Sequence, residues 1–267
     1  MIIMKFVILA DIHLGPQAYF KGVLRKVNDN AMILIKNFVE EINKNVKPDF
    51  VVILGDLIED EEEVKDKERI KNIIALLSKL TCPVYYSAGN HDLMKISEND
   101  LKELFKQESL YYSFDFGDLH FVNLFARRIE KGNVQILPEQ LTWLKNDLGK
   151  TSKKCVVFLH YSLADQDLKG NPWFEGAPEL CLVRNRAEVR EIFEKSGRVI
   201  AVFNSHLHWN KIHFHNSVPY FTIQSLVENQ DDKGIASEAY AIVEINKKRV
   251  NVLVKGKYPQ DYKVELK

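Results

Sequence analysis

Five short apolar runs of the chain (6–10, 51–54, 84–88, 156–159 and 199–203) are each followed within a few residues by residue types that can bind metal ions. Those residues are, in chain order, Asp11, His13, Asp56, Asn90, His91, Asp92, His160, His206 and His208. Imidazole and carboxylate donors together suit manganese, iron or zinc better than calcium or magnesium. The residue types therefore predict a transition-metal site, provided that the fold brings them together.

The apolar runs are short and rich in β-branched residues, which is typical of strands buried on both faces. The predicted strands cover residues 6–11, 50–56, 83–90, 155–161 and 199–206. In an open α/β sheet, ligands bind beyond the carboxyl ends of the strands. We therefore expect the polar residues to converge at one edge of the fold.

Helical periodicity fills the segments between these strands, and the predicted helices lie within 34–42, 70–77, 141–148 and 185–197. Residues 110–125 are expected to form a hairpin that turns at Gly117-Asp118, and the chain after residue 209 becomes strand after strand. This order predicts an α/β protein with two packed, mixed sheets flanked by helices, in a single domain over residues 1–267.

The segment "SHLHWNKIHFH" holds two histidine pairs with the same one-residue gap. His213 and His215 share one face of a predicted strand with Lys211, which is typical of a half-solvated strand. His206 and His208 instead follow an apolar run directly. We therefore interpret His206 and His208 as the metal-binding pair.

Composition narrows the class of protein. The formal net charge of the 267 residues is +0, so no excess of basic residues indicates binding to nucleic acid or to an anionic membrane. No apolar stretch approaches the roughly 18 residues of a membrane span, and no signal peptide is recognisable. Three widely separated cysteines argue against a disulfide framework. We expect a cytoplasmic protein without a membrane partner.

Five sequence blocks, in this order, resemble those of the calcineurin-like metallophosphoesterases. They are Asp11-Ile12-His13, Gly55-Asp56, Gly89-Asn90-His91-Asp92, His160 and His206-Leu207-His208. The resemblance implies a four-layer α/β/β/α sandwich over essentially the whole chain. Ser205 departs from the pattern, since family members usually carry glycine there, and Tyr161 replaces the more usual histidine or proline.

The resemblance also implies two metal ions (manganese, iron or zinc) and a phosphoesterase that attacks small nucleotide-like phosphodiesters or pyrophosphates with a metal-bound hydroxide. One ion would be held by Asp11, His13, Asp56 and His208, and the other by Asp56, Asn90, His160 and His206. His91 would stabilise developing charge or protonate the leaving oxygen, with Asp92 orienting it. Phosphomonoesterase, DNA nuclease and non-catalytic scaffold stay open as alternatives, although nucleic acid is disfavoured by the neutral charge.

Substrate contacts are expected from the Gly/Pro-rich loop at 167–186. Trp173 and Phe174 could stack a nucleobase, or they could be a hydrophobic plug that holds the loop down. Arg184 and Arg186 could reach a second phosphate. The charge run at 59–69 begins acidic and ends basic, which predicts a solvated helix N-terminus rather than a binding site.

Overall fold

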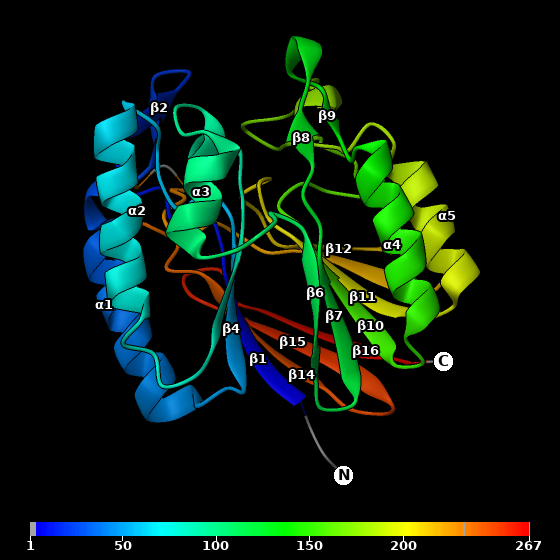
Figure 1. Cartoon of the computed structure of the whole chain (residues 1–267). Coiled ribbons are helices and arrows are strands. Elements are labelled where there is room, and N and C mark those ends of the chain that lie inside the picture. The colour runs from blue at the N-terminus through cyan, green and yellow to red at the C-terminus, as the bar shows by residue number, and fades with distance from the viewer. Residues whose placement is uncertain (1–3, 232, 267) are drawn as a thin grey trace.

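The computed structural model describes residues 4–231 and 233–266, and within them two six-stranded sheets form the centre of the molecule (Figure 1). The first sheet runs in the order β16 (Gln260–Glu265), β15 (Arg249–Lys255), β14 (Tyr240–Ile245), β1 (Met4–Leu9), β4 (Phe50–Leu54) and β5 (Val84–Ser87). The second runs β12 (Lys211–His215), β13 (Val218–Thr222), β11 (Val199–Asn204), β10 (Lys154–Phe158), β7 (Leu119–Asn123) and β6 (Tyr112–Phe116).

Both sheets are mixed, and their centres are parallel. Strands β1, β4 and β5 pair in parallel, as do β7, β10, β11 and β13, whereas the remaining pairs are antiparallel. Leu9 at the end of β1 pairs with Ile53 near the end of β4, and Phe158 at the end of β10 pairs with Phe203 of β11. The parallel strands therefore end at matching heights, which aligns the residues that follow them.

An aromatic core joins the inner faces of the two sheets. The ring of Phe6 stacks on Phe50 at 5.1 Å and meets the rings of Phe121, Phe158 and Phe203 edge-on at 5.6–5.9 Å. Edge-on and stacked aromatic pairs each stabilise a core by about 0.5–1.5 kcal/mol beyond the area that they bury. This packing fixes the position of one sheet on the other.

Helices cover both outer faces, which confirms the four-layer architecture (Figure 1). The first sheet is covered by α1 (Ala31–Glu41), α2 (Glu63–Leu77) and α3 (Glu98–Phe105), and the second by α4 (Pro138–Lys150) and α5 (Arg186–Ser196). A π-helical turn (Ile42–Val46) extends α1. None of the helices in the described part of the chain is long and apolar enough to cross a membrane.

Two small hairpins stand at the end of the molecule where the central parallel strands finish (Figure 1). They are β2 (Ala18–Phe20) with β3 (Val23–Lys26), and β8 (Arg127–Arg128) with β9 (Val134–Gln135). Short 3-10 helices occupy Asn28–Asn30, His91–Leu93, Glu130–Gly132 and Pro178–Leu180. The sequence predicted neither these hairpins nor strand β16. Both hairpins border the edge at which the candidate ligands meet.

Candidate metal centre

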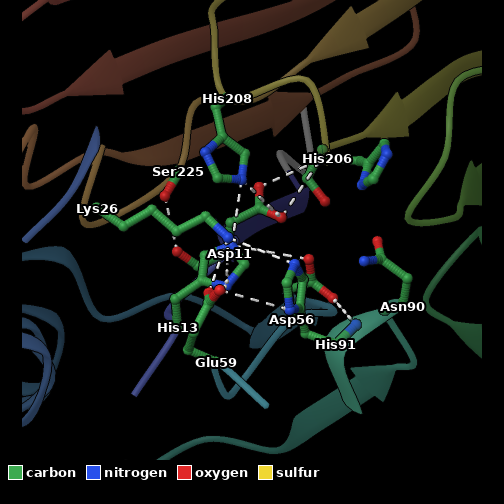
Figure 2. Close-up of polar contacts among 12 residues, drawn as sticks. Asp11, His13, Lys26, Asp56, Glu59, Asn90, His91, His206, His208 and Ser225 are labelled. Carbon is green, nitrogen blue, oxygen red and sulfur yellow. Dashed lines mark hydrogen bonds and ion pairs between the residues drawn. The ribbon is translucent and has the colours of Figure 1, made fainter. Parts of the chain in front are cut away.

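The metal-capable residues meet between the carboxyl ends of the two sheets, as expected. Asp11 and His13 follow β1, Asp56 follows β4, His160 follows β10, and His206 and His208 follow β11. Figure 2 shows His13, His206 and His208 around Asp11 and Asp56. All six are buried, with at most 6% of each residue exposed. Two ionisable carboxylates and four imidazoles this deep in a protein need compensating charge.

The backbone at these residues is strained. A positive φ of 48–66° occurs at five residues that are not glycine: Asp11, His13, Asp56, His206 and His208. Each such left-handed residue costs about 1–3 kcal/mol and is found mostly where function requires it. The turns hold one another in place, since the Asp11 and His13 N–H groups donate to the carbonyls of Gly55 and Asp56 at 3.2 and 3.0 Å.

The first group of candidate ligands, which we name position 1, contains Asp11, His13 and His208. Their nearest donor atoms all lie within 4.8 Å of one another, and the Nε2 atoms of His13 and His208 are 3.1 Å apart.

The second group, position 2, contains Asp56, His160 and His206. The Nε2 atom of His160 lies 3.0 Å from Nδ1 of His206 and 3.2 Å from Oδ1 of Asn90. Asn90 thus adds a fourth oxygen donor here.

Asp56 links the two positions. A single oxygen, Oδ2, lies 3.7 Å from Nε2 of His13 and 3.3 Å from Nε2 of His160. One carboxylate in this place can contact ions at both positions, as in dinuclear hydrolytic centres.

The protonation of the four imidazoles fits metal binding. In each ring, the nitrogen that faces away from the paired histidine contacts an oxygen acceptor, so that nitrogen carries the proton. The acceptors are Glu59 at 3.0 Å for His13, Glu228 at 2.6 Å for His208, Leu54 O at 2.8 Å for His160, and Leu180 O at 3.2 Å for His206. The inner nitrogens of each pair lie 3.0–3.1 Å apart, so that both can bind one cation placed between them.

Burial and neighbouring charges shift the pKa values of the candidate ligands in different directions. Burial lowers the pKa of His13 and His206 well below the ordinary value, which keeps both rings neutral and able to bind a metal. Burial raises the pKa of Asp11 to about 6. Burial opposes charge on His160, but the carboxylate of Asp56 outweighs it and raises the pKa of His160 to about 9.

His91 stands beside both positions. Its backbone N–H donates to Oδ1 of Asp56 at 2.8 Å, and its Nδ1 donates to Oδ1 of Asp60 at 2.6 Å. Burial lowers its pKa, but the carboxylates of Asp56 and Asp60 outweigh burial and raise the pKa above its ordinary value. His91, His13 and Asp56 also form a third group compact enough to hold an ion, so a test of its role must include metal content.

The expected contact between Asp92 and His91 is replaced by another. Asp92 is fully buried, and its carboxylate accepts hydrogen bonds from the backbone N–H groups of Leu57 at 2.8 Å and Gly89 at 2.9 Å. These bonds join the turn after β4 to the turn after β5. The carboxylate of Asp92 therefore holds the backbone of these two turns together. The residue that orients His91 is Asp60, which corrects the expectation from sequence.

Glu59 and Lys26 are site residues that the sequence did not indicate. Glu59 precedes α2 and faces His13, whereas the run at 59–69 was expected to be a solvated helix start. Lys26 Nζ is buried, 2.8 Å from Oε2 of Glu59 and 3.4 Å from Nε2 of His91. Glu63 and Asp66 do lie in the first turn of α2, as expected, but Asp66 is buried and not solvated.

The two aromatic residues of the 167–186 loop lie against the candidate ligands. The ring of Trp173 is 5.6 Å from His208 and 5.0 Å from Phe20 of the β2–β3 hairpin. The ring of Phe174 is 4.7 Å from His206 and packs against a small apolar cluster under the loop. Phe174 therefore has the contacts of a plug, and Trp173 forms part of the wall beside position 1.

The two arginines of this loop do not join the cluster. The guanidinium of Arg186 pairs with Asp165, with Nε 2.5 Å from Oδ1, and the same carboxylate also pairs with Arg190. Arg184 is exposed, and no described contact connects it to a candidate ligand. A contact of Arg184 or Arg186 with a second phosphate stays a prediction.

Small residues allow the turns that carry the candidate ligands to lie close to one another. A Cβ atom added at Gly89 would clash with Oδ1 and the backbone nitrogen of Asp56. Ser205 fits where the family usually has glycine, because its hydroxyl donates to the carbonyl of Leu54 at 2.8 Å, beside Nδ1 of His160. The departure therefore adds a support behind position 2 and displaces no ligand.

Comparison with known proteins agrees with this geometry. The profile of the calcineurin-like phosphoesterase family matches residues 4–210, which include every candidate ligand. A probable cyclic nucleotide phosphodiesterase of Coxiella burnetii is 27% identical over 164 residues, covering 58% of this chain and 59% of that protein. Another, from Fibrobacter succinogenes, is 25% identical over 210 residues, covering 77% and 73%. The chain thus spans less than two thirds of the Coxiella relative.

Solved structures share the fold. A dimetal phosphatase from Danio rerio superposes with a TM-score of 0.81 at 17% identity, covering 99% of both chains. A purple acid phosphatase from yellow lupin superposes with a TM-score of 0.67 at 12% identity, covering 97% of this chain and 52% of that one. The family match over residues 4–210 shows that this chain belongs to the calcineurin-like phosphoesterase family, and the two solved structures share its fold.

Proposed function

We propose that this chain hydrolyses phosphodiester or pyrophosphate bonds of small, nucleotide-like substrates at positions 1 and 2. The observation that carries the proposal is the single oxygen of Asp56 that reaches imidazoles of both positions. The ligands that we assign are Asp11, His13, Asp56 and His208 for one ion, and Asp56, Asn90, His160 and His206 for the other.

Two bound ions of this kind polarise a phosphoryl oxygen and lower the pKa of water enough for it to attack at neutral pH. The chain's own part is to hold four imidazoles and two carboxylates in register. The buried, interlocked turns after β1 and β4 do this before substrate arrives, so little reorganisation is needed during the reaction.

His91 is the candidate general acid. Asp60 holds the proton on its Nδ1, so Nε2 is the nitrogen that faces the site and can pass a proton to the leaving oxygen. The raised pKa of His91 increases the protonated fraction near neutral pH, which suits this role. Lys26, 3.4 Å from Nε2, adds positive charge where a phosphate would lie.

Two features favour small substrates. The net charge of +0 offers no basic surface for a nucleic acid backbone. Trp173 and Phe174 place aromatic rings beside the two positions, where a nucleobase could stack. The curated relatives with probable cyclic nucleotide phosphodiesterase activity agree with this class of substrate.

A substrate panel with added manganese tests the proposal. We expect hydrolysis of bis-p-nitrophenyl phosphate and of at least one compound among cyclic nucleotides, ADP-ribose and CDP-alcohols. Faster cleavage of simple monoesters would favour a phosphomonoesterase, and faster cleavage of single-stranded DNA would favour a nuclease. A protein that holds two ions and cleaves none of these substrates would contradict the proposal and favour a scaffold.

A further inference from the structure

The histidines of the two metal positions rest on chemically different partners. At position 1, the outer nitrogens of His13 and His208 donate to the carboxylates of Glu59 and Glu228. At position 2, the outer nitrogens of His160 and His206 face neutral backbone carbonyls. This difference does not depend on which ions are bound.

Glu228 is a buried carboxylate with its charge directed at His208. The residue is 1% exposed, and its Oε2 accepts from Nδ1 of His208 at 2.6 Å and from Nε1 of Trp173 at 3.1 Å. In the described part of the chain, its Oε1 is buried and has no hydrogen-bond partner. The indole N–H therefore fixes the carboxylate against the imidazole from the opposite side.

Glu59 contacts His13 as Glu228 contacts His208, and the side chain of Lys26 holds the Glu59 carboxylate in place. Its Oε2 lies 3.0 Å from Nδ1 of His13 and 2.8 Å from Nζ of Lys26. Lys26 is itself held over the ring of Trp173 at 5.1 Å. Glu59, Lys26, Trp173 and Glu228 thus form a continuous frame around the two histidines of position 1.

At position 2 the corresponding contacts carry no formal charge. The carbonyl of Leu54 lies 2.8 Å from Nδ1 of His160, and the carbonyl of Leu180 lies 3.2 Å from Nε2 of His206. A carboxylate that accepts the outer proton stabilises the positive charge that a metal draws onto an imidazole ring more than a neutral carbonyl does.

We propose that Glu59 and Glu228 are positioning residues that make position 1 bind its ion more tightly than position 2, so that the centre fills in a fixed order. The inference rests on the proposed function only in assuming that both positions hold ions. Asp11, a carboxylate at position 1 where position 2 has the amide of Asn90, acts in the same direction.

Isothermal titration calorimetry of the metal-free protein with manganese tests the order in which the two positions fill. We expect two binding steps whose affinities differ by at least about tenfold. His208→Ala should remove the tight step and His206→Ala the weak one. Glu228→Gln and Glu59→Gln should each weaken the tight step by about 10- to 100-fold and change the weak step by less than about threefold.

Asp60→Asn is the matched control, since it removes one negative charge close to the centre but from behind His91, which is not a proposed ligand. It should leave both steps within about threefold of wild type. Thermal unfolding of each metal-free variant reports folding. Should buried Glu228→Gln fail to fold, Glu59→Gln carries the test, because the Glu59 side chain is 15% exposed.

Two ions bound with equal affinity would overturn the inference, as would glutamine variants that weaken the wrong step or behave like Asp60→Asn. None of these measurements uses a substrate, so a failure of the filling order can be distinguished from a failure of the proposed function. Equal binding with intact hydrolysis would contradict only the filling order, and ordered binding without hydrolysis would contradict only the proposed function.

Discussion

Two histidine pairs with identical spacing lie seven residues apart and have different surroundings. His206 and His208 are buried, adopt a left-handed backbone just after β11, and donate to Leu180 O and Glu228. His213 and His215 lie half-buried on one face of β12, in regular strand conformation, where His215 pairs with Glu194 at 3.0 Å. The candidate metal groups found among the described residues include only the first pair.

The difference teaches that spacing alone does not identify a ligand pair. His206 and His208 differ from the second pair in three ways. Both rings are buried, an acceptor lies behind each outer nitrogen, and the backbone adopts a left-handed conformation that costs free energy. On a regular strand, alternate residues share a face at no conformational cost, so a histidine pair there needs no functional explanation.

Replacing the shared carboxylate should have the largest effect. Asp56→Asn removes the oxygen that reaches both positions, so we expect metal affinity to fall more than about 100-fold at both and hydrolysis of bis-p-nitrophenyl phosphate to fall to background. Elemental analysis and the hydrolysis assay measure the two effects. Retention of two ions and of full turnover would show that Asp56 does not bridge.

His91→Ala should separate proton transfer from metal binding. We expect turnover to fall by about 10²- to 10⁴-fold while the metal content stays at the wild-type value. Loss of an ion from this variant would mean that His91 is a ligand, in the third group with His13 and Asp56.

Asp60→Asn should have a smaller effect of the same kind. Asparagine can still contact Nδ1 of His91 but provides no negative charge to support the imidazolium, so the pKa of His91 should fall. We therefore expect about a tenfold loss of turnover and an alkaline limb of the pH–rate profile shifted to lower pH. A profile identical to that of wild type would remove Asp60 from the mechanism.

Substitutions in the second histidine pair should have almost no effect on metal content or turnover. His213→Ala and His215→Ala should each leave metal content and turnover within about twofold of wild type. Loss of the exposed contact between His215 and Glu194 should change the free energy of unfolding by less than about 1 kcal/mol. A loss of metal from either variant would break the comparison between the pairs.

The strands and their polar ends could be predicted because both signals are local. Buried parallel strands appear as continuous apolar runs, and the residues after them must meet where the strands end. Asp11, Asp56, His160 and His206 lie where that reasoning placed them. The four-layer arrangement followed from the same alternation of strands and helices.

Glu59, Asp60, Lys26 and Glu228 could not be predicted in this way. They come from a short hairpin and from turns, where no periodicity sets the direction of a side chain. The acidic run that contains Glu59 matched a helix start, and the helix does begin at Glu63. That pattern does not specify that Glu59 and Asp60, at the start of the run, face histidines. Such contacts depend on tertiary packing.

Anomalous diffraction from a crystal soaked in manganese tests the central claim most directly. We predict two peaks about 3.5–4 Å apart, one beside His13 and His208 and one beside His160 and His206, with Asp56 between them. Anomalous density at His213 and His215 with none beside Asp56 would contradict the account.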